Sequence, residues 1–168
     1  LQVTRVAAGF QNLREIVSGE FDAVFCLGNS IPHLLTESDL RLGLNNFFSL
    51  LRPGGILFLQ LLNYDRILSV RERVQSVKEN QAATFIRFYD YDYQEGLILF
   101  NLLKLERKDR VIEQSLISVP LRPVTSAALL DALAATGLTS VQTYGGIAMD
   151  PFDPGTSKDL VVLATRGS

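Results

Sequence analysis

The chain of 168 residues is poor in the residues that most often mark metal and redox sites. It has one cysteine, Cys26, one histidine, His33, and no tryptophan. A single cysteine excludes an internal disulfide, and a single histidine excludes a histidine-rich metal site within one chain. Asp150 and Asp153, which flank Pro-Phe, are more typical of a turn than of a metal site. Cys26 lies in an apolar segment, so we interpret it as a core residue in a protein of the reducing cytoplasm.

The chain also lacks an excess of charge of either sign. Its 16 Lys and Arg and 18 Asp and Glu give a formal net charge of -2, with no long basic cluster. Nucleic acid or an anionic membrane surface is therefore not expected as a partner. No apolar run reaches the roughly 18 to 20 residues of a membrane span, and the N-terminal residues do not have the pattern of a signal peptide.

Familiar catalytic motifs are missing as well. The sequence contains no Walker loop, HExxH, GxSxG or GxGxxG motif, and no serine lies on a nucleophile elbow with which His33 could form a catalytic triad. Apolar residues, by contrast, make up 47% of the chain. This fraction is enough to build one core, so we expect a single domain over residues 1–168.

The first third of the sequence has the pattern of a strand, a helix and a second strand. Residues 21–27 and 56–62 are continuous apolar runs, which is typical of buried strands. Between them, Thr36 or Ser38 can cap a helix that runs to about Leu51. Two strands joined by a helix imply a right-handed parallel crossover, so we predict an α/β fold.

The middle of the chain is β-rich and predicts an antiparallel insertion over residues 82–120. Its strands are expected at residues 82–91, 97–106 and 111–120, with hairpin turns at residues 94–96 and 108–110. Further strands are expected at residues 3–7, 140–144 and 158–164. A helix opened by Thr125 or Ser126 and stopped by Gly137 completes the prediction.

The loop after the first apolar run is the best candidate for a binding site. Ligands of open α/β sheets bind where strands end in loops, and here the run ends in Gly28, Asn29 and Ser30. Gly28 gives the backbone freedom, and Asn29 offers both a donor and an acceptor. As alternatives, Asn29 and Ser30 cap the next turn, and His33 is a structural hydrogen-bonding residue.

Three segments resemble a known family. FDAVFCLGNSIPHL, LRPGGILFLQLLNYDRIL and LLDALAATGLTSVQTYGG are similar to the later part of a class I S-adenosylmethionine-dependent methyltransferase. The GNS-x-x-HL and NYD motifs most resemble the glycine and sarcosine N-methyltransferase group. The resemblance implies a Rossmann-like fold with a mixed sheet, S-adenosylmethionine as cofactor, and methyl transfer to a small-molecule acceptor, expected at nitrogen.

The resemblance also implies roles for individual residues. It assigns to the cofactor Gly9, Phe10, Leu27, Gly28, Asn29 and Ser30. Gly9 stands where members of the family have an acidic residue facing adenine, so that hydrogen bond is not expected here. His33 and Tyr64 are the expected catalytic residues, with a neutral His33 accepting the proton of an amine acceptor.

The acceptor pocket is expected to include Tyr64 and Tyr144. Asp65 is either a third pocket residue or a helix N-cap. Leu62 stands where the glycine-methylating members have an arginine that holds the substrate carboxylate. Without that cation a bidentate clamp cannot form, so glycine is not the expected acceptor.

The resemblance further implies that the family's first strand, glycine-rich loop and ribose-binding acidic residue would precede Leu1. The only methionine is Met149, so we expect an N-terminally truncated domain that is inactive by itself. Its strand at residues 21–27 would then have a bare edge, and another chain could pair with it at Val24. A homo-oligomer is one expected consequence.

Two other classes of function remain open. One is a binding or assembly module that keeps the methyltransferase fold without catalysis, which is favoured by Gly9 and Leu62. The other is a nicotinamide-dependent enzyme, which is disfavoured because the first-strand fingerprint of such enzymes is not visible.

Overall fold

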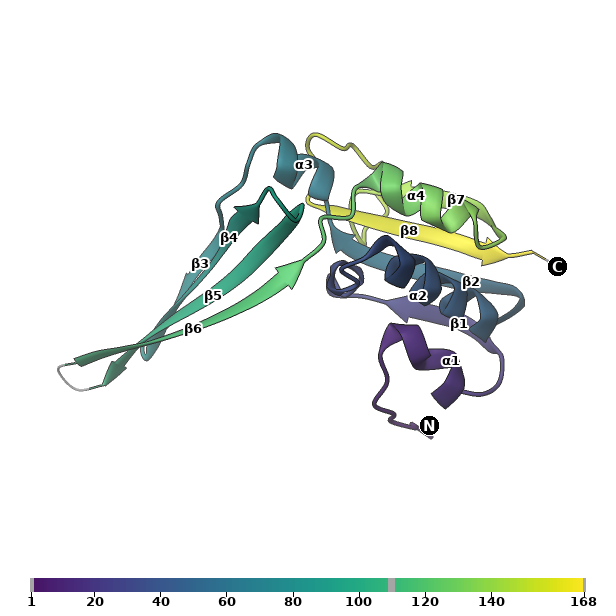
Figure 1. Ribbon diagram of the computed structural model, residues 1–168, viewed down its shortest axis with the longest axis horizontal. Coiled ribbons are helices and arrows are strands. Elements are labelled where there is room, and N and C mark those ends of the chain that lie inside the picture. The colour runs from purple at the N-terminus through teal and green to yellow at the C-terminus, as the bar shows by residue number, and fades with distance from the viewer. Residues whose placement is uncertain (1, 109–110, 168) are drawn as a thin grey trace. The chain divides into compact units, whose positions relative to one another are not determined.

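The structure is a computed structural model that describes residues 2–108 and 111–167 (Figure 1). Its contacts divide the chain into two compact units. Unit 1 consists of Leu1–Arg66 and Val124–Ser168, and unit 2 consists of Ile67–Pro123. The single domain over residues 1–168 stays a prediction.

Unit 1 is built on a four-stranded mixed sheet in the order β1-β2-β8-β7. These strands are β1 (Phe21–Cys26), β2 (Leu51–Leu62), β7 (Leu138–Tyr144) and β8 (Asp159–Arg166). β1 and β2 are parallel, whereas β8 is antiparallel to both β2 and β7. The helix α2 (Glu37–Leu50) joins the two parallel strands. The predicted strand-helix-strand crossover and the mixed sheet are therefore confirmed.

Side-chain caps fix where the two main helices begin. Thr36 Oγ1 accepts a hydrogen bond from the backbone N–H of Asp39 at 3.1 Å, so Thr36 and not Ser38 is the N-cap of α2. Thr125 Oγ1 does the same for α4 (Ser126–Ala134). Asp65 Oδ2 accepts from the N–H of Ser126 at 2.8 Å. Asp65 thus caps α4 and not its own helix, α3 (Tyr64–Ser69).

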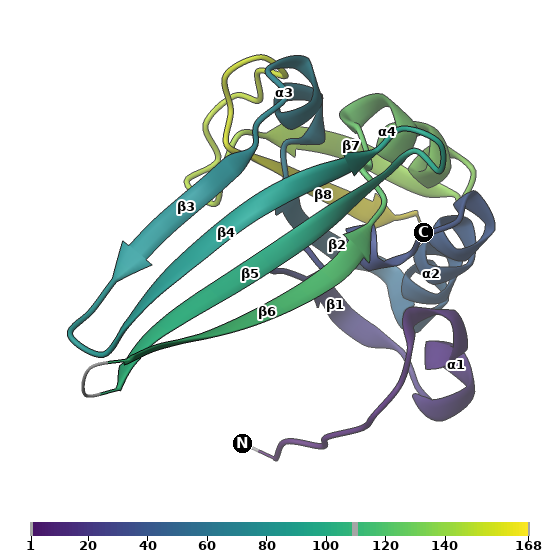
Figure 2. The ribbon, with the colours of Figure 1, turned by 60° about the vertical axis from the view of Figure 1, so that its left-hand side comes forward.

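The core of unit 1 lies between α2 and one face of the sheet (Figure 2). Alternate residues of β2 face this core and are fully buried, together with one stripe of α2. They are Leu57, Leu59 and Leu61 from the strand and Leu40, Leu44, Phe47 and Leu50 from the helix. Because the helix has a period of 3.6 and the strand a period of 2, each element presents one apolar face to the other.

The prediction that β1 is a buried strand is wrong. Only Cys26 is buried in it, and Phe25 is 62% exposed. β1 is the edge strand of its sheet, and Phe25 lies on the face opposite Cys26, beside Phe58 at a ring-centroid distance of 5.8 Å. In the described part of the chain no helix covers this apolar side of the strand.

The predicted strand at residues 3–7 is also wrong. Those residues are exposed, with Val3 at 76%, and they pair with no strand among the residues that the structure describes. A strand needs a hydrogen-bonded neighbour, and propensity alone does not supply one. The chain continues instead into a 3₁₀ turn, η1 (Phe10–Asn12), and the short helix α1 (Leu13–Ile16).

Unit 2 is a four-stranded antiparallel sheet in the order β3-β4-β5-β6 (Figure 2). Its strands are β3 (Val74–Glu79), β4 (Ala83–Asp92), β5 (Leu97–Lys108) and β6 (Val111–Leu121). The three predicted strands of the insertion are confirmed, and β3 adds one that the sequence reading missed. The turn at residues 94–96 is confirmed, whereas Asp109 and Arg110 of the second predicted turn lie outside the described residues.

Candidate functional site

The candidate site is the loop Leu27–Ser30, which follows β1 at the carboxyl edge of the sheet. β1 and β2 are parallel and pair Cys26 with Leu59, so both strands end at this edge. Gly28 has a φ of 74° and Asn29 a φ of 63°, so two consecutive residues adopt the left-handed conformation. A Cβ added at Gly28 would meet nothing within 4 Å. Backbone conformation, and not space, therefore favours glycine there.

Gln60 on β2 holds this loop in place. Its Oε1 accepts from the N–H of Gly28 at 2.7 Å, and its backbone carbonyl accepts from the N–H of Asn29 at 3.3 Å. The amide Nε2 of Gln60 in turn donates to Asp159 Oδ1 at 2.9 Å. Sequence reasoning did not single out Gln60. The feature that could have identified it is that Gln60 is the one polar residue in the apolar run at residues 56–62.

The side chain of Asn29 is locked at both ends. Its Oδ1 accepts from the N–H of Leu62 at 3.0 Å, and its Nδ2 donates to the hydroxyl of Tyr64 at 3.0 Å. A primary amide has two donor hydrogens and two acceptor lone pairs. One donor and one acceptor position of Asn29 therefore remain for a ligand.

Tyr64, a predicted catalytic and acceptor residue, is fully buried in this structure. Burial raises the pKa of its hydroxyl to about 12, and the hydrogen bond from Asn29 acts in the opposite direction. The phenol is thus neutral at physiological pH. The buried hydroxyl of Tyr64 holds the side chain of Asn29 in place through their hydrogen bond. Tyr64 therefore positions Asn29 and presents no exposed surface to a ligand.

A cavity of about 290 Å³ opens beside the loop in unit 1. Residues from two segments that lie some twenty positions apart in the sequence line it together. They are Ala8, Gly9, Phe10, Gln11, Ser30, His33 and Leu34. The structure thus gathers four predicted site residues at one cavity, while Leu27, Gly28 and Asn29 belong to the adjoining loop. The volume is at the low end for a ligand pocket, which is about 300 to 1,000 Å³.

The first of these segments is anchored on α2. Asn46 Nδ2 donates to the carbonyls of Phe10 and Gln11, both at 2.8 Å, and the ring of Phe10 meets Phe47 edge to face at 5.2 Å. Gly43 allows this close approach, because a Cβ there would lie 3.0 Å from Leu34 Cδ1 and 3.4 Å from Phe10 Cβ. The wall of the cavity is therefore built by packing against the helix.

His33 lies at the cavity with an exposed side chain. It ends the short 3₁₀ turn η2 (Ile31–His33), whose Ile31 and Pro32 are buried. The N–H of His33 donates to the carbonyl of Ser30 at 3.2 Å. Burial of its two neighbours thus fixes the turn while the imidazole stays accessible to a ligand.

Tyr144 does not line this cavity. It lies at the end of β7, two strands away from β2, and its hydroxyl donates to Gln142 Oε1 at 3.0 Å. The prediction of a turn at Asp153 is confirmed, since its Oδ1 accepts from the N–H groups of Gly155 and Thr156 at 2.7 and 2.9 Å. These bonds, that of Gly155 first, lower the pKa of the Asp153 carboxyl.

Two kinds of site are not found in the described part of the chain. No group of three or more His, Cys, Asp and Glu residues there could hold a metal ion. Nor is any described helix long and apolar enough to cross a membrane.

Part of the chain is similar in sequence to known proteins. No family model matches. Glycine/sarcosine N-methyltransferase of Parasynechococcus marenigrum is 44% identical over 73 residues, which are 44% of this chain and 26% of that protein. Glycine N-methyltransferase of Mus musculus is 49% identical over 61 residues, covering 33% of this chain and 21% of the mouse protein. The matched part is thus about a quarter of these relatives.

Solved structures match nearly the whole of this chain, which spans less than two thirds of their own length. An S-adenosylmethionine-dependent methyltransferase from Clostridium acetobutylicum has a TM-score of 0.81 at 12% identity, covering 97% of this chain and 64% of its own. The CcbJ methyltransferase from Streptomyces caelestis also has a TM-score of 0.81, at 20% identity, covering 97% and 63%. The chain therefore has the fold of the class I S-adenosylmethionine-dependent methyltransferases and is related to the glycine and sarcosine N-methyltransferases.

Proposed function

We propose that the protein to which this chain belongs transfers a methyl group from S-adenosylmethionine to a nitrogen of a small-molecule acceptor. The observation that carries the proposal is the cavity at which Gly9 and Phe10 meet Ser30 and His33. The resemblance assigns the first three of these to the cofactor. Relatives named as glycine/sarcosine N-methyltransferases support the choice of nitrogen.

The residues present fit part of the cofactor. Phe10 offers an aromatic ring and Ser30 a hydroxyl at the cavity, and the loop at Gly28 and Asn29 is already held in its left-handed conformation. The free donor and acceptor positions of Asn29 suit an amino acid group. Gly9 brings no carboxylate, so an adenine amino group would need another acceptor, such as a backbone carbonyl or Oε1 of Gln11, which also lines the cavity.

When bound, the cofactor would supply a methyl group on a positively charged sulfur; the nucleophile would bond to the methyl carbon in line as the carbon–sulfur bond breaks, and the sulfur would leave as a neutral thioether. Such a step depends on alignment and on exclusion of water more than on an activated side chain. The rigid loop at Gly28 and Asn29 contributes alignment. His33, exposed at the cavity, accepts the proton that the amine loses, directly or through water.

The acceptor we propose is an amine without a carboxylate next to it. Leu62 is apolar, so it cannot form the charged clamp that an amino acid substrate would need. Tyr144 and Tyr64 remain the proposed acceptor residues, with Tyr64 acting through Asn29. We further propose that the protein is cytoplasmic, which the single buried thiol of Cys26 supports.

A second candidate is a module that keeps the fold and assembles without catalysis. Gly9 and Leu62 favour it, and so does the edge strand β1 with the exposed Phe25. We propose that a second copy of the chain pairs with this edge, because long apolar edges invite pairing.

A methyl-transfer assay separates the candidates. The whole protein is incubated with methyl-labelled S-adenosylmethionine and a panel of small amines, and label in the product is counted. Replacing His33 with Ala should lower the rate by about 10²- to 10⁴-fold if it is the base. Leu42→Ala, a change at an exposed residue of α2 that does not line the cavity, is the control. Full activity of His33→Ala would contradict the base role, and no transfer to any amine would favour the non-catalytic module.

A further inference from the structure

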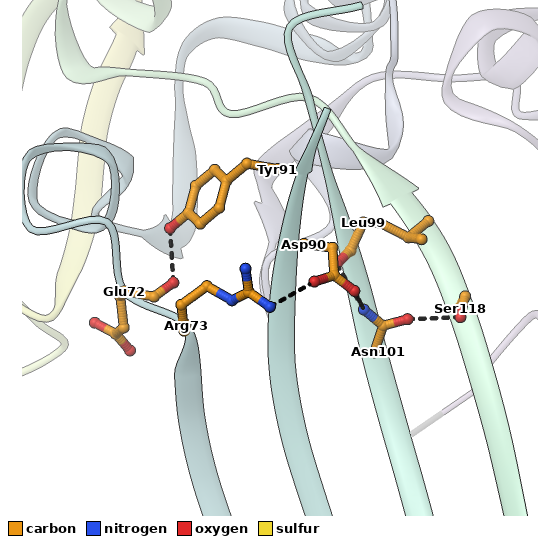
Figure 3. A network of polar contacts seen from close by, with 7 residues as sticks. All are labelled: Glu72, Arg73, Asp90, Tyr91, Leu99, Asn101 and Ser118. Carbon is orange, nitrogen blue, oxygen red and sulfur yellow. Dashed lines mark hydrogen bonds and ion pairs between the residues drawn. The ribbon is translucent and has the colours of Figure 1, made fainter. Parts of the chain in front are cut away.

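A polar network crosses the sheet of unit 2 at the level of Asp90 (Figure 3). Arg73 Nη2 donates to Asp90 Oδ1 at 2.9 Å, and Asn101 Nδ2 donates to Asp90 Oδ2 at 3.0 Å. Ser118 Oγ donates to Asn101 Oδ1 at 2.6 Å. The four side chains come from Arg73, which immediately precedes β3, and from β4, β5 and β6, so the carboxylate of Asp90 is fixed from two sides.

Asn101 is the unusual member of this network. It is a polar residue that is only 2% exposed, and its neighbours along the same face of β5, Leu99 and Leu103, are apolar. Burying an amide costs free energy unless its donors and acceptor are paired. Here its Nδ2 is shared between Asp90 and the carbonyl of Leu99, and its Oδ1 is bound by Ser118. What this arrangement achieves is a defined orientation of Asp90.

Asp90 lines a cavity of about 560 Å³ that is formed by unit 2 alone. β4 and β5 pair Asp90 with Leu99 and Asp92 with Leu97, and β5 and β6 pair Leu99 with Pro120. Paired residues share a face of a sheet, and so do residues two apart on one strand. Three apolar side chains and two carboxylates therefore lie on one face, at one hollow.

The charge at this cavity is negative. Its lining has two carboxylates, Asp90 and Asp92, and no Lys, Arg or His among the described residues. Arg73 compensates Asp90 from outside the lining. Asp92 Oδ1 accepts from the backbone N–H groups of Gln94 and Glu95 at 3.0 and 3.1 Å, and these two bonds bring no cation to its carboxylate.

We propose that this cavity binds an organic cation, namely a protonated amine with an apolar body. The apolar surface of Leu97, Leu99 and Pro120 suits the body, and the carboxylates of Asp90 and Asp92 suit an ammonium group. A metal ion fits less well, because no group of three ligating side chains occurs in the described residues. The proposal does not depend on methyl transfer, and its test needs no cofactor.

The test is a titration of the full chain with three probes of the same size but different charge: benzylamine, benzyl alcohol and benzoate. Binding is followed by backbone amide shifts in nuclear magnetic resonance spectra. We expect benzylamine to bind about tenfold more tightly than benzyl alcohol, with benzoate the weakest. The largest shifts should fall in residues 90–99, and added salt should weaken only the binding of benzylamine.

Two variants remove the charge while keeping the shape. Asp90→Asn keeps an acceptor for Asn101, and Asp92→Asn keeps the turn, since asparagine forms the same local hydrogen bonds. Each should remove most of the preference for benzylamine. Asp22→Asn is the matched control, because Asp22 is an exposed carboxylate that pairs with Arg52 in unit 1. Equal affinity for the three probes, or an unchanged preference in both folded variants, would overturn the proposal.

Discussion

The side-chain amide of Asn29 donates to the buried hydroxyl of Tyr64 across 3.0 Å. This bond ties the loop after β1 to the first residue of α3. Together with the contacts from Gln60, it holds a non-glycine residue in the left-handed conformation, which such residues rarely adopt. The candidate site therefore depends on a residue that a ligand would not touch.

The first prediction concerns that bond. Tyr64→Phe leaves the ring in place but removes the acceptor of Asn29 Nδ2. An unpaired donor in a part-buried place should cost about 1 to 3 kcal/mol in the free energy of unfolding, measured by urea denaturation.

Tyr144→Phe is its matched control. The hydroxyl of Tyr144 makes an exposed hydrogen bond to Gln142, so this change should cost less than about 0.5 kcal/mol. Equal costs for the two variants would show that the bond from Asn29 does not support the loop.

The second prediction concerns the close approach at Gly43. Gly43→Leu forces a side chain against Leu34 and Phe10, where even a Cβ is tight. We expect a loss of about 1 to 3 kcal/mol or more from overpacking. We also expect faster amide exchange in residues 8–12, because the segment would leave α2. A control at Leu42, which is exposed on the same helix, should leave exchange there unchanged when it is replaced by Ala.

The third prediction concerns Cys26 and alkaline pH. Burial raises the pKa of its thiol from 9.0 to about 11. Between these values the unfolded chain has lost the proton while the folded chain keeps it, so stability falls as pH rises. The loss should reach about 2 to 3 kcal/mol by pH 11.

Comparison with Cys26→Ala isolates this effect, since other groups also titrate there. The unfolding free energy of the unmodified chain should fall more steeply from pH 9 to 11 than that of the variant. Parallel pH profiles would mean that the thiol is not buried. At pH 7 the thiol should also resist alkylation in the folded chain.

The fourth prediction concerns the edge strand β1. If a second copy pairs with it, sedimentation should show a mass above that of one chain. Phe25→Lys should then shift the mass toward the monomer, because lysine on an edge opposes pairing. Tyr93→Lys, at a tyrosine of unit 2 that is 74% exposed, is the control. A monomer at all concentrations would contradict the proposed pairing of two copies at β1.

Much of the fold could be predicted from the sequence where the pattern is local. The apolar period of α2, its cap at Thr36 and the run of β2 were enough to predict the crossover. β3 was missed because Val74–Glu79 mixes polar and charged residues, and its strand conformation depends on pairing with β4. The strand predicted at residues 3–7 was wrong for the opposite reason, since this segment has the residues of a strand but pairs with no strand in the part of the chain that the structure describes.

The loop of the candidate site could be predicted from the sequence, but the hydrogen bonds that hold this loop could not. Gly28, Asn29 and Ser30 stand out because they end an apolar run. Gln60 and Asp159 do not, because their contact joins residues 99 positions apart. The burial of Tyr64 could not be foreseen either, since a tyrosine after a strand fits an exposed pocket and a packed helix equally well.

The measurement that tests the central claim most directly is calorimetric binding of S-adenosylhomocysteine to the whole protein to which this chain belongs, unmodified and with Gly9→Phe. Gly9 has an ordinary φ of -78°, so a phenylalanine there strains no backbone, and its Cβ would lie 3.1 Å from Oε1 of the flexible Gln11 side chain. Because Gly9 lines the cavity, we expect the added ring to occupy part of it. Gly146→Phe, in open space outside the cavity, is the control. We predict that the unmodified protein and the control bind and that folded Gly9→Phe does not. Absence of binding to the folded whole protein, or equal binding to all three proteins, would contradict the proposed cofactor site.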